Sequence, residues 1–485
     1  MMGLIETFAE KAIASGAYQP LDKVYVANKV RALVGDQDGD VQAGRSIAEQ
    51  LVDLSIENGK IEDGQTEREI LNEQLFDLLT PTPSAVNARF WQEYQRSPEA
   101  ATGWFYQLCT ENDYVKVAAI KKNVEFTRQV KDGNELEITI NLSKPEKDPK
   151  AIAAAAHDTA KKYPQCALCI ENEGYLGCLG QAARSNHRVI RMMIGGKGWG
   201  FQYSPYAYFH EHCIFLDLQH EPMKIDQQTL VNLVEIEKTL PHYFVGSNAD
   251  LPIVGGSMLA HEHYQGGRHT FPMMKAPIKQ ELTFKDYPQV KAGIVDWPMS
   301  DIRLETTDQL ALINLGTHIM KTWNDYSDPA LSIVATGQDG TRHHTVTPIM
   351  HRGGETFVLD LVLRDNNTSD EYPLGIFHPH EKLWHIKKEN IGLIEVMGRA
   401  ILPARLKVEL EEVKKFWLNE DNQIAPAHLP WAQEVAARRD IMSANVEAVL
   451  EEELAQVFSD VLEDAGVFKR TDEGDAGWQR FIKQL

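Results

Sequence analysis

The chain has 485 residues, of which 43% are hydrophobic and 25% are charged, and its formal net charge is -21. This composition is typical of a globular protein, and the length is sufficient for two or three domains or for one large duplicated fold. The negative charge argues against nucleic acid or an anionic membrane as a partner, because so acidic a surface would be repelled by both.

The sequence has no apolar run of about 18 residues that could span a membrane. The segment Met1–Lys11 contains Glu6 and Glu10, whereas a signal peptide would have a basic end followed by an apolar stretch. The five cysteines are too few, and odd in number, for a disulfide framework. We therefore expect a cytoplasmic protein whose cysteines are thiols or metal ligands.

The first part of the chain is predicted to be helical. Apolar residues recur at helical intervals from residue 4 to about residue 126, and prolines interrupt this pattern at Pro81 and Pro83. Residues 135–142 alternate between apolar and polar side chains, which predicts a strand. An alanine-rich helix is expected over residues 151–162.

Cys166 and Cys169 follow this predicted helix and are separated by two residues. Two cysteines with this spacing can bind one metal ion, most often zinc. His220 and His261 lie downstream and could complete a Cys2His2 site. Buried, reduced thiols are the alternative interpretation, and the spacing alone does not decide between the two.

Arg184 opens a short basic and polar run at the start of the next apolar strand. It could contact a phosphate, although a solvated strand edge would have the same composition. Residues 202–217 predict two strands joined at Pro205. Asp226 is expected to cap a helix that ends near Leu240.

The segment from residue 255 to residue 269 contains three histidines, a glutamine and an arginine among four glycines. In an extended strand His261, His263 and Gln265 would project from one face. A neutral imidazole can attack phosphorus and hold the product until a second acceptor arrives, while Gln265 can donate a hydrogen bond to a phosphate oxygen. A histidine-rich surface hairpin or a plain metal site is the alternative.

The same order of elements is predicted a second time further along the chain. Strand-forming residues at 290–304, a helix at 307–323 and extended segments at 343–349 and 356–363 repeat the earlier pattern. We interpret this as an internal duplication. The predicted domains are a helical region, a first repeat with the active site, a second repeat and a helical tail, at residues 1–150, 151–282, 283–402 and 403–485.

Lys388 and Glu395 flank a glycine in the second repeat. The lysine could bind the phosphate of a sugar phosphate, and the carboxylate could accept hydrogen bonds from sugar hydroxyls. A charged strand edge explains the same residues equally well.

The glycine-flanked segment His261–Gln265, together with Tyr203–Tyr206 and Glu211–Cys213 before it, resembles the galactose-1-phosphate uridylyltransferase family. The resemblance is strongest to the bacterial second class of this family, a branch of the histidine triad superfamily. Similar stretches at Asp22–Asn28, Cys166–Tyr175 and Leu359–Arg364 extend it along nearly the whole chain. It implies an α+β fold with a duplicated, histidine-triad-like antiparallel sheet unit, a helical N-terminal region and a helical C-terminal tail.

The resemblance also implies a reaction of galactose metabolism. A uridylyl group would pass from UDP-glucose to galactose 1-phosphate through a uridylyl-histidine, in a ping-pong mechanism that yields glucose 1-phosphate and UDP-galactose. A homodimer is also implied. The alternatives are a nucleotide hydrolase or phosphorylase of the same superfamily, and a non-catalytic protein that binds sugar nucleotides.

Roles for individual residues follow from the same resemblance. His263 would be the nucleophile, and Gln265 would contact the phosphate. The position three residues before His261, where the better known class has a serine, is Met258. The other implied contacts are Asn248, Gly256 and Ser257 near the nucleotide, Lys388 and Glu395 near the sugar phosphate, and Cys166, Cys169, His220 and His261 as ligands of a structural zinc.

Overall fold

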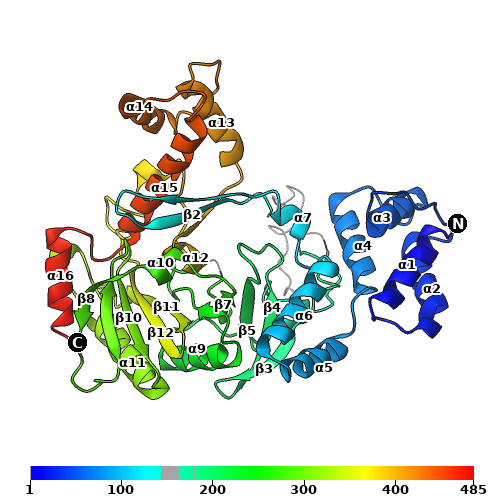
Figure 1. The fold of residues 1–485 in the computed structure, drawn as a ribbon, viewed down its shortest axis with the longest axis horizontal. Helices are drawn as coiled ribbons and strands as arrows, with labels where there is room; N and C mark the ends of the chain where they lie inside the picture. Colours follow the sequence, from blue (N-terminus) through cyan, green and yellow to red (C-terminus); the bar gives the residue numbers. More distant parts are fainter. Residues whose placement is uncertain (1, 144–162, 179–180, 257) are drawn as a thin grey trace.

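The computed structural model describes residues 2–143, 163–178, 181–256 and 258–485. Its centre is a ten-stranded sheet in which all neighbouring strands are antiparallel (Figure 1). The order across the sheet is β3-β4-β5-β7-β6-β11-β12-β10-β9-β8. In chain order the strands are β3 (Ile190–Ile194), β4 (Lys197–Tyr203), β5 (Cys213–Asp217), β6 (Phe244–Gly246), β7 (His263–Gly267), β8 (Ile278–Leu282), β9 (Lys291–Val295), β10 (Asp301–Thr306), β11 (His344–Gly353) and β12 (Thr356–Asp365).

The strand order has the same form when it is read inward from either edge. The first half runs β3-β4-β5-β7-β6, and the second half, read from the opposite edge, runs β8-β9-β10-β12-β11. One helix follows the third strand of each half, α9 (Gln227–Thr239) after β5 and α11 (Gln309–Asp325) after β10. The halves meet where β6 pairs with β11. This repeated topology confirms the predicted α+β fold with an internal duplication.

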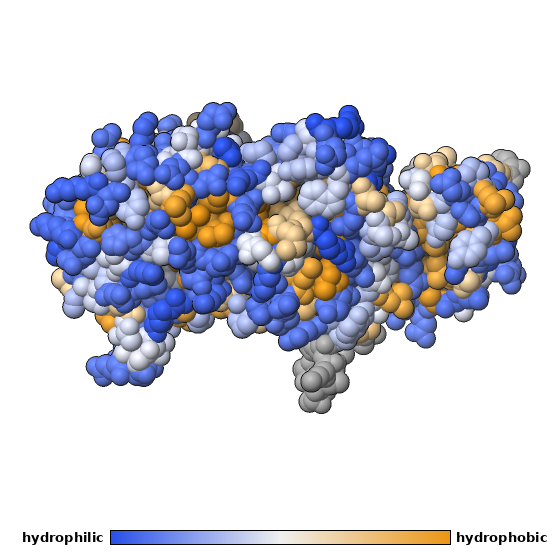
Figure 2. Space-filling view, turned by 90° about the horizontal axis from the view of Figure 1, so that it is seen from below, coloured by the Kyte–Doolittle hydropathy of each residue, from blue (hydrophilic) through white to orange (hydrophobic). Residues whose placement is uncertain are grey.

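Helices α9 and α11 contact each other and cover one face of the sheet (Figure 1). Asp226 caps α9 as predicted, because its carboxylate accepts hydrogen bonds from the backbone N–H groups of Gln228 and Thr229. The inward residues of both helices, such as Leu233 and Leu315, belong to the main hydrophobic core. Figure 2 shows this side of the molecule from below, with hydrophilic side chains over most of its surface.

The other face of the sheet is covered by a small sheet and short helices. Strand β2 (Glu135–Ile140) confirms the predicted strand and pairs with both β1 (Val124–Gln129) and β13 (Arg399–Leu402). Between the two sheets lie α10 (Pro272–Lys275) and α12 (Leu393–Val396). A second core contains side chains from this layer and from β11 and β12, including Leu393, Ile349 and Val362.

The N-terminal region is helical as predicted up to α7, although β1 begins two residues before the expected end of that region. Helices α1 to α4 share a small core of their own and lie at one end of the molecule (Figure 1). Phe90 and Phe105, from the next two helices, contact Phe201 of β4. The helices are α1 (Leu4–Ala14), α2 (Lys23–Val34), α3 (Ile47–Glu57), α4 (Gln65–Asp77), α5 (Pro83–Tyr94), α6 (Pro98–Glu111) and α7 (Val117–Ile120).

The C-terminal tail is helical, as predicted. It consists of α13 (Leu406–Trp417), α14 (Leu429–Arg438), α15 (Val446–Ala465) and α16 (Asp472–Ile482). Helix α15 contacts β1 and β2, whereas α16 contributes Trp478 and Phe481 to the main core. None of the helices within the described ranges is long and apolar enough to cross a membrane.

Two sequence predictions concern parts of the chain that the structure does not test. The helix expected over residues 151–162 lies outside the described residues. The domain boundaries after residues 150, 282 and 402 remain predictions. Strand β8, which pairs with β9, lies just before the second of these boundaries.

Candidate active site

Strand β7 carries both residues that the sequence predicts as catalytic, His263 and Gln265. Tyr264 lies between them, and its hydroxyl accepts a hydrogen bond from Asn232 of α9 at 2.9 Å. Tyr264 therefore faces the helical layer. Because side chains alternate along a strand, His263 and Gln265 project from the opposite face, toward the small sheet β1-β2-β13.

The imidazole of His263 is oriented by one hydrogen bond. Its Nδ1 lies 2.8 Å from the backbone oxygen of His261, and a carbonyl can only accept, so Nδ1 carries the proton and Nε2 keeps its lone pair. Burial lowers the pKa of His263 to about 4. No group in the described part of the chain forms a hydrogen bond with Nε2. The site thus contains a neutral imidazole with a free nucleophilic nitrogen.

Gln265 has a partner that the sequence analysis did not select. Nε2 of His212 lies 3.0 Å from Oε1 of Gln265. His212 immediately precedes β5, where Cys213 pairs with Gly266 of β7. The sequence signal was the run Glu211–Cys213, but only the register of β5 against β7 identifies His212 as a neighbour of Gln265.

The glycines after Gln265 permit this close packing. A Cβ atom on Gly266 would lie 2.6 Å from the backbone oxygen of Phe244, and one on Gly267 would lie 2.5 Å from that of Glu211. Gly267 also has a φ of 145°, which disfavours other residues. Glycine at both positions therefore lets β6 and the loop before β5 approach β7.

The four predicted metal ligands lie together. Their ligand atoms are all within 4.8 Å of one another. Sγ of Cys166 is 3.2 Å from Nδ1 of His261, and Sγ of Cys169 is 3.1 Å from Nδ1 of His220. Tetrahedral zinc with bonds of about 2.0–2.3 Å would separate its ligands by roughly 3.3–3.8 Å. The residues therefore form a candidate metal-binding cluster whose donors and spacing fit zinc.

His261 joins this cluster to the nucleophile. Its Nε2 lies 2.8 Å from the backbone oxygen of Asp217, which directs Nδ1 toward the two sulfurs. The backbone oxygen of the same residue accepts the hydrogen bond of His263. A change in the position of His261 is therefore transmitted directly to His263.

Asn248 connects two segments that were predicted to contact the nucleotide and the sugar phosphate. Its Oδ1 accepts a hydrogen bond of 2.9 Å from the backbone N–H of Leu393, the first residue of α12. A Cβ atom on Gly256 would lie 2.7 Å from its Nδ2, so Gly256 packs directly against Asn248. Ser257, predicted to lie nearby, is outside the described residues.

Glu395 forms an ion pair with Lys387, the residue before the predicted contact Lys388. Nζ of Lys387 lies 2.8 Å from Oε1 of Glu395, and both residues are buried. Lys388 is exposed, with its Nζ 4.6 Å from the centre of the Trp384 ring. The sequence alone does not indicate which of two adjacent lysines turns inward, and Lys387 was not among the predicted site residues.

Arg184 lies at a cavity between the N-terminal helices and the loop before β5. Its guanidinium carbon is 5.9 Å from the centre of the Tyr114 ring, and it lines a cavity of about 720 Å³ together with Lys116 and Tyr206. Neither His263 nor Gln265 lines this cavity. The proposed role of Arg184 as a phosphate contact remains a prediction.

Comparisons with known proteins identify the family. Sequence models of the N-terminal and C-terminal domains of galactose-1-phosphate uridyl transferase match residues 16–222 and 235–433. A galactose-1-phosphate uridylyltransferase from Lactobacillus helveticus is 67% identical over 484 residues, covering 100% of this chain and 99% of the relative.

More distant proteins were found as well. Galactose-1-phosphate uridylyltransferase 1 of Streptococcus pneumoniae is 51% identical over 490 residues, covering 100% of this chain and 99% of the relative. Among solved structures, yeast Ap4A phosphorylase in complex with Ap4A matches 63% of this chain and 88% of its own, with a TM-score of 0.35 and 10% identity. By its two domain matches and its full-length relatives, the chain belongs to the galactose-1-phosphate uridylyltransferase family.

Proposed function

We propose that this chain transfers a uridylyl group from UDP-glucose to galactose 1-phosphate, through a covalent intermediate on His263. The observation that carries the proposal is the imidazole of His263, in which Nδ1–H is engaged by a carbonyl and Nε2 is free. The name shared by the relatives, galactose-1-phosphate uridylyltransferase, supplies the acceptor and the transferred group.

The reaction divides into two displacements at the same phosphorus atom. First, Nε2 of His263 attacks the α-phosphorus of UDP-glucose, the bond to the bridging oxygen breaks, and glucose 1-phosphate leaves with the electron pair. A phosphate oxygen of galactose 1-phosphate then attacks, the phosphorus–nitrogen bond breaks, and UDP-galactose forms. No external base is needed, because a phosphate oxygen is both the leaving group and the incoming nucleophile.

Residues around His263 would position the substrates. The amide of Gln265 is suited to donate a hydrogen bond to a non-bridging oxygen of the transferred phosphate, where charge develops in the transition state. We assign the nucleotide side of the site to Asn248, Gly256 and Ser257. Lys387 and Lys388 would bind the phosphate of the sugar phosphates, because a phosphorylated substrate needs local positive charge on so acidic a protein, and Glu395 would accept hydrogen bonds from the sugar hydroxyls.

We further propose that the Cys/His cluster binds a structural zinc ion. With four protein ligands, such an ion supplies a cross-link and offers no open position to substrate. The ion would thereby link Cys166 and Cys169 to His220 and His261. The carbonyl of His261 is then held in place to orient His263.

Isotope exchange tests the two-step route. The protein is mixed with UDP-glucose and radiolabelled glucose 1-phosphate, without galactose 1-phosphate. A uridylyl-histidine intermediate predicts that label enters UDP-glucose, because the first displacement is reversible by itself. The variant His263→Ala should not exchange label.

Acceptor specificity separates the proposed reaction from its alternatives. Formation of UDP-galactose on addition of galactose 1-phosphate supports the transferase. Release of UMP in water alone, or of UDP with inorganic phosphate, would identify a hydrolase or a phosphorylase. Binding of UDP-glucose without exchange or release would identify a non-catalytic binding protein.

We also propose that the protein acts as a cytoplasmic homodimer, which follows from the family resemblance. Light scattering coupled to gel filtration tests the subunit number. A molar mass close to twice the 54.7 kDa of the chain is expected.

A further inference from the structure

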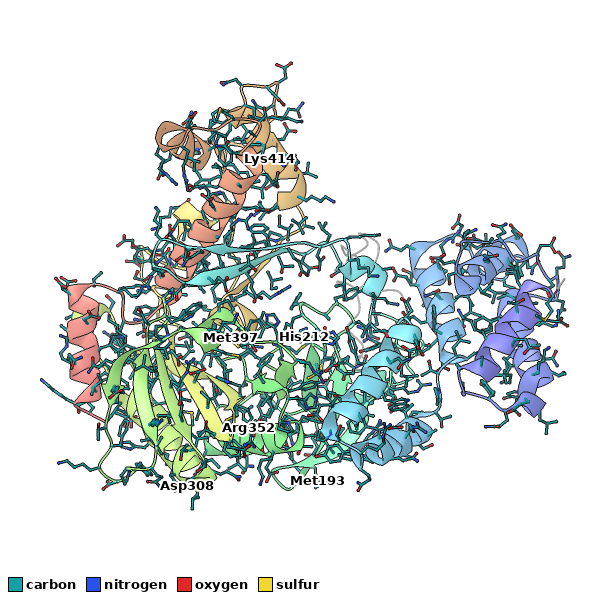
Figure 3. The ribbon with its side chains drawn as sticks, in the orientation of Figure 1. Met193, His212, Asp308, Arg352, Met397 and Lys414 are labelled. Carbon is teal, nitrogen blue, oxygen red and sulfur yellow. The ribbon has the colours of Figure 1, made fainter. Side chains whose placement is uncertain are left out.

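His212 contacts the predicted phosphate-binding residue Gln265 from the end of the neighbouring strand β5, on the side of the central sheet that faces the small sheet (Figure 3). We propose that His212 is a positioning residue, which holds the Gln265 amide so that its NH2 end faces the transferred phosphate. This inference rests on the proposed function, since it concerns the phosphate that His263 receives.

The hydrogen bonds of His212 fix the position of its proton. Its Nδ1 lies 3.4 Å from the backbone nitrogen of Tyr208, which can only donate, so Nδ1 is the acceptor. Nε2 therefore carries the proton and donates it to Oε1 of Gln265 at 3.0 Å. Burial agrees with this neutral form, because it lowers the pKa of His212 to about 4.

Burial and packing against two aromatic rings also restrict the movement of the His212 ring. The residue is 3% exposed, and its ring stacks on Tyr208 with centroids 5.4 Å apart and touches Phe209 at 4.6 Å. The preceding residue, Glu211, accepts a hydrogen bond of 2.7 Å from the hydroxyl of Tyr243. A donor held in this way can hold a second side chain in one orientation.

The hydrogen bond from His212 determines which end of the Gln265 amide faces the substrate, the acceptor Oε1 or the donor Nε2. With Oε1 occupied by His212, the Nε2 hydrogens point elsewhere, and nothing in the described ranges accepts them. They are available to a phosphate oxygen. Without the His212 donor the amide could rotate, and its oxygen would then face the phosphate oxygens and repel them.

The test measures single-turnover uridylylation of the protein by UDP-glucose in a set of variants. His212→Phe keeps an aromatic ring and removes the donor; it should slow uridylylation by about 10–100-fold with little change in the KM for UDP-glucose. His212→Gln should restore most of the rate, because its amide nitrogen can reach the position of the histidine Nε2. His212→Asn, which is polar but too short, should resemble His212→Phe.

A double-mutant cycle separates positioning from a general structural effect. If His212 acts through Gln265, then adding His212→Phe to Gln265→Ala should change the rate by less than about twofold. His210→Phe, on the same loop and with a side chain 59% exposed, should behave like the wild type. Thermal unfolding of each variant measures any loss of stability.

Two results would overturn the inference while leaving the proposed function intact. One is wild-type uridylylation in both His212→Phe and His212→Asn. The other is an equal loss from His212→Phe with and without Gln265. Absence of any uridylylation in the wild type would instead overturn the proposed function, and this inference with it.

Discussion

Gln265 and Asp360 occupy matching places in the two halves of the central sheet. Gln265 pairs with Gly246 of β6, and Asp360 pairs with Ile349 of β11. Gly246 and Ile349 pair with each other at the junction of the halves. The two side chains therefore lie in one row, on the same face, at equal distances from the centre of the sheet.

The chemistry at these places is opposite. Asp360 is fully buried and forms an ion pair with Arg303, at 2.6 Å, and its other oxygen is 3.5 Å from His351. In the first half, His263 and Gln265 are neutral and keep hydrogen-bonding groups that the described residues do not use. One backbone arrangement thus supports an internally satisfied ion pair in one half and a reactive pair in the other.

The largest expected difference in activity between the halves concerns His263 and Val358. His263 lies two residues before Gln265, and Val358 lies two residues before Asp360. His263→Asn removes the nucleophile and should reduce UDP-galactose formation by roughly 10³-fold or more. Val358→Ala, at the matching place in the second half, should cost about 2 kcal/mol of stability and leave the rate of the folded protein unchanged. Comparable losses of rate in both variants would contradict the assignment of chemistry to the first half.

Substitution of Gln265 should affect mainly the rate of turnover, whereas substitution of Asp360 should affect mainly stability. Gln265→Ala should slow turnover by about 10²-fold, because a donor to the developing charge is lost, with little change in Tm. Asp360→Ala should destabilise the fold by about 3–5 kcal/mol, because Arg303 remains buried without its partner. Steady-state kinetics and urea unfolding of both variants measure these two effects. A loss of rate confined to Asp360→Ala would contradict the prediction.

Metal removal should affect the first half selectively. Cys169→Ser removes one of the four clustered ligands and should lower zinc content, Tm and, by about 10–100-fold, activity, since the carbonyl of His261 is no longer fixed. Cys109→Ala, a buried cysteine outside the cluster, is the control. Full activity of metal-free protein would show that the cluster does not position His263.

The smallest expected difference between the halves is the effect of low pH on stability. Burial lowers the pKa of three histidines in the first half, His212, His242 and His263, to about 4, and it lowers the pKa of one histidine in the second half, His385, to about the same value. In the unfolded chain these histidines become protonated near pH 6.5, whereas in the folded chain they remain neutral until the pH approaches 4. Their contribution to stability is therefore complete above about pH 6.5 and is lost as the pH falls from there toward 4.

One histidine can be removed without touching the catalytic strand. His242→Gln should reduce the loss of stability between pH 7 and pH 5 by up to about 2 kcal/mol. Identical pH profiles for wild type and His242→Gln would contradict this account of the acid sensitivity.

Periodicity and spacing were sufficient to predict the repeated fold and the shared face of His263 and Gln265. The alternation of His261, His263 and Gln265 predicts their shared face, and the repeated order of strands and helices predicts the duplication. These features depend on neighbouring residues, and local patterns express them directly. The spacing of Cys166 and Cys169 likewise predicted half of the candidate metal-binding cluster.

Contacts between distant segments could not be predicted in the same way. His212 reaches Gln265 only because β5 and β7 pair in one particular register, and nothing in the local sequence fixes that register. The ion pair of Lys387 with Glu395 likewise joins residues whose contact depends on the folded path of the chain. The match between Asp360 and Gln265 also emerges only from the complete sheet.

Intact mass spectrometry followed by peptide mapping measures directly whether the first half carries the chemistry on His263. The protein is mixed at neutral pH with UDP-glucose and no acceptor. We expect a gain of one uridylyl group on the peptide that contains His263, labile in acid and removed by galactose 1-phosphate. A label on any other residue, or UDP-galactose formation without a label in the His263→Asn variant, would contradict it.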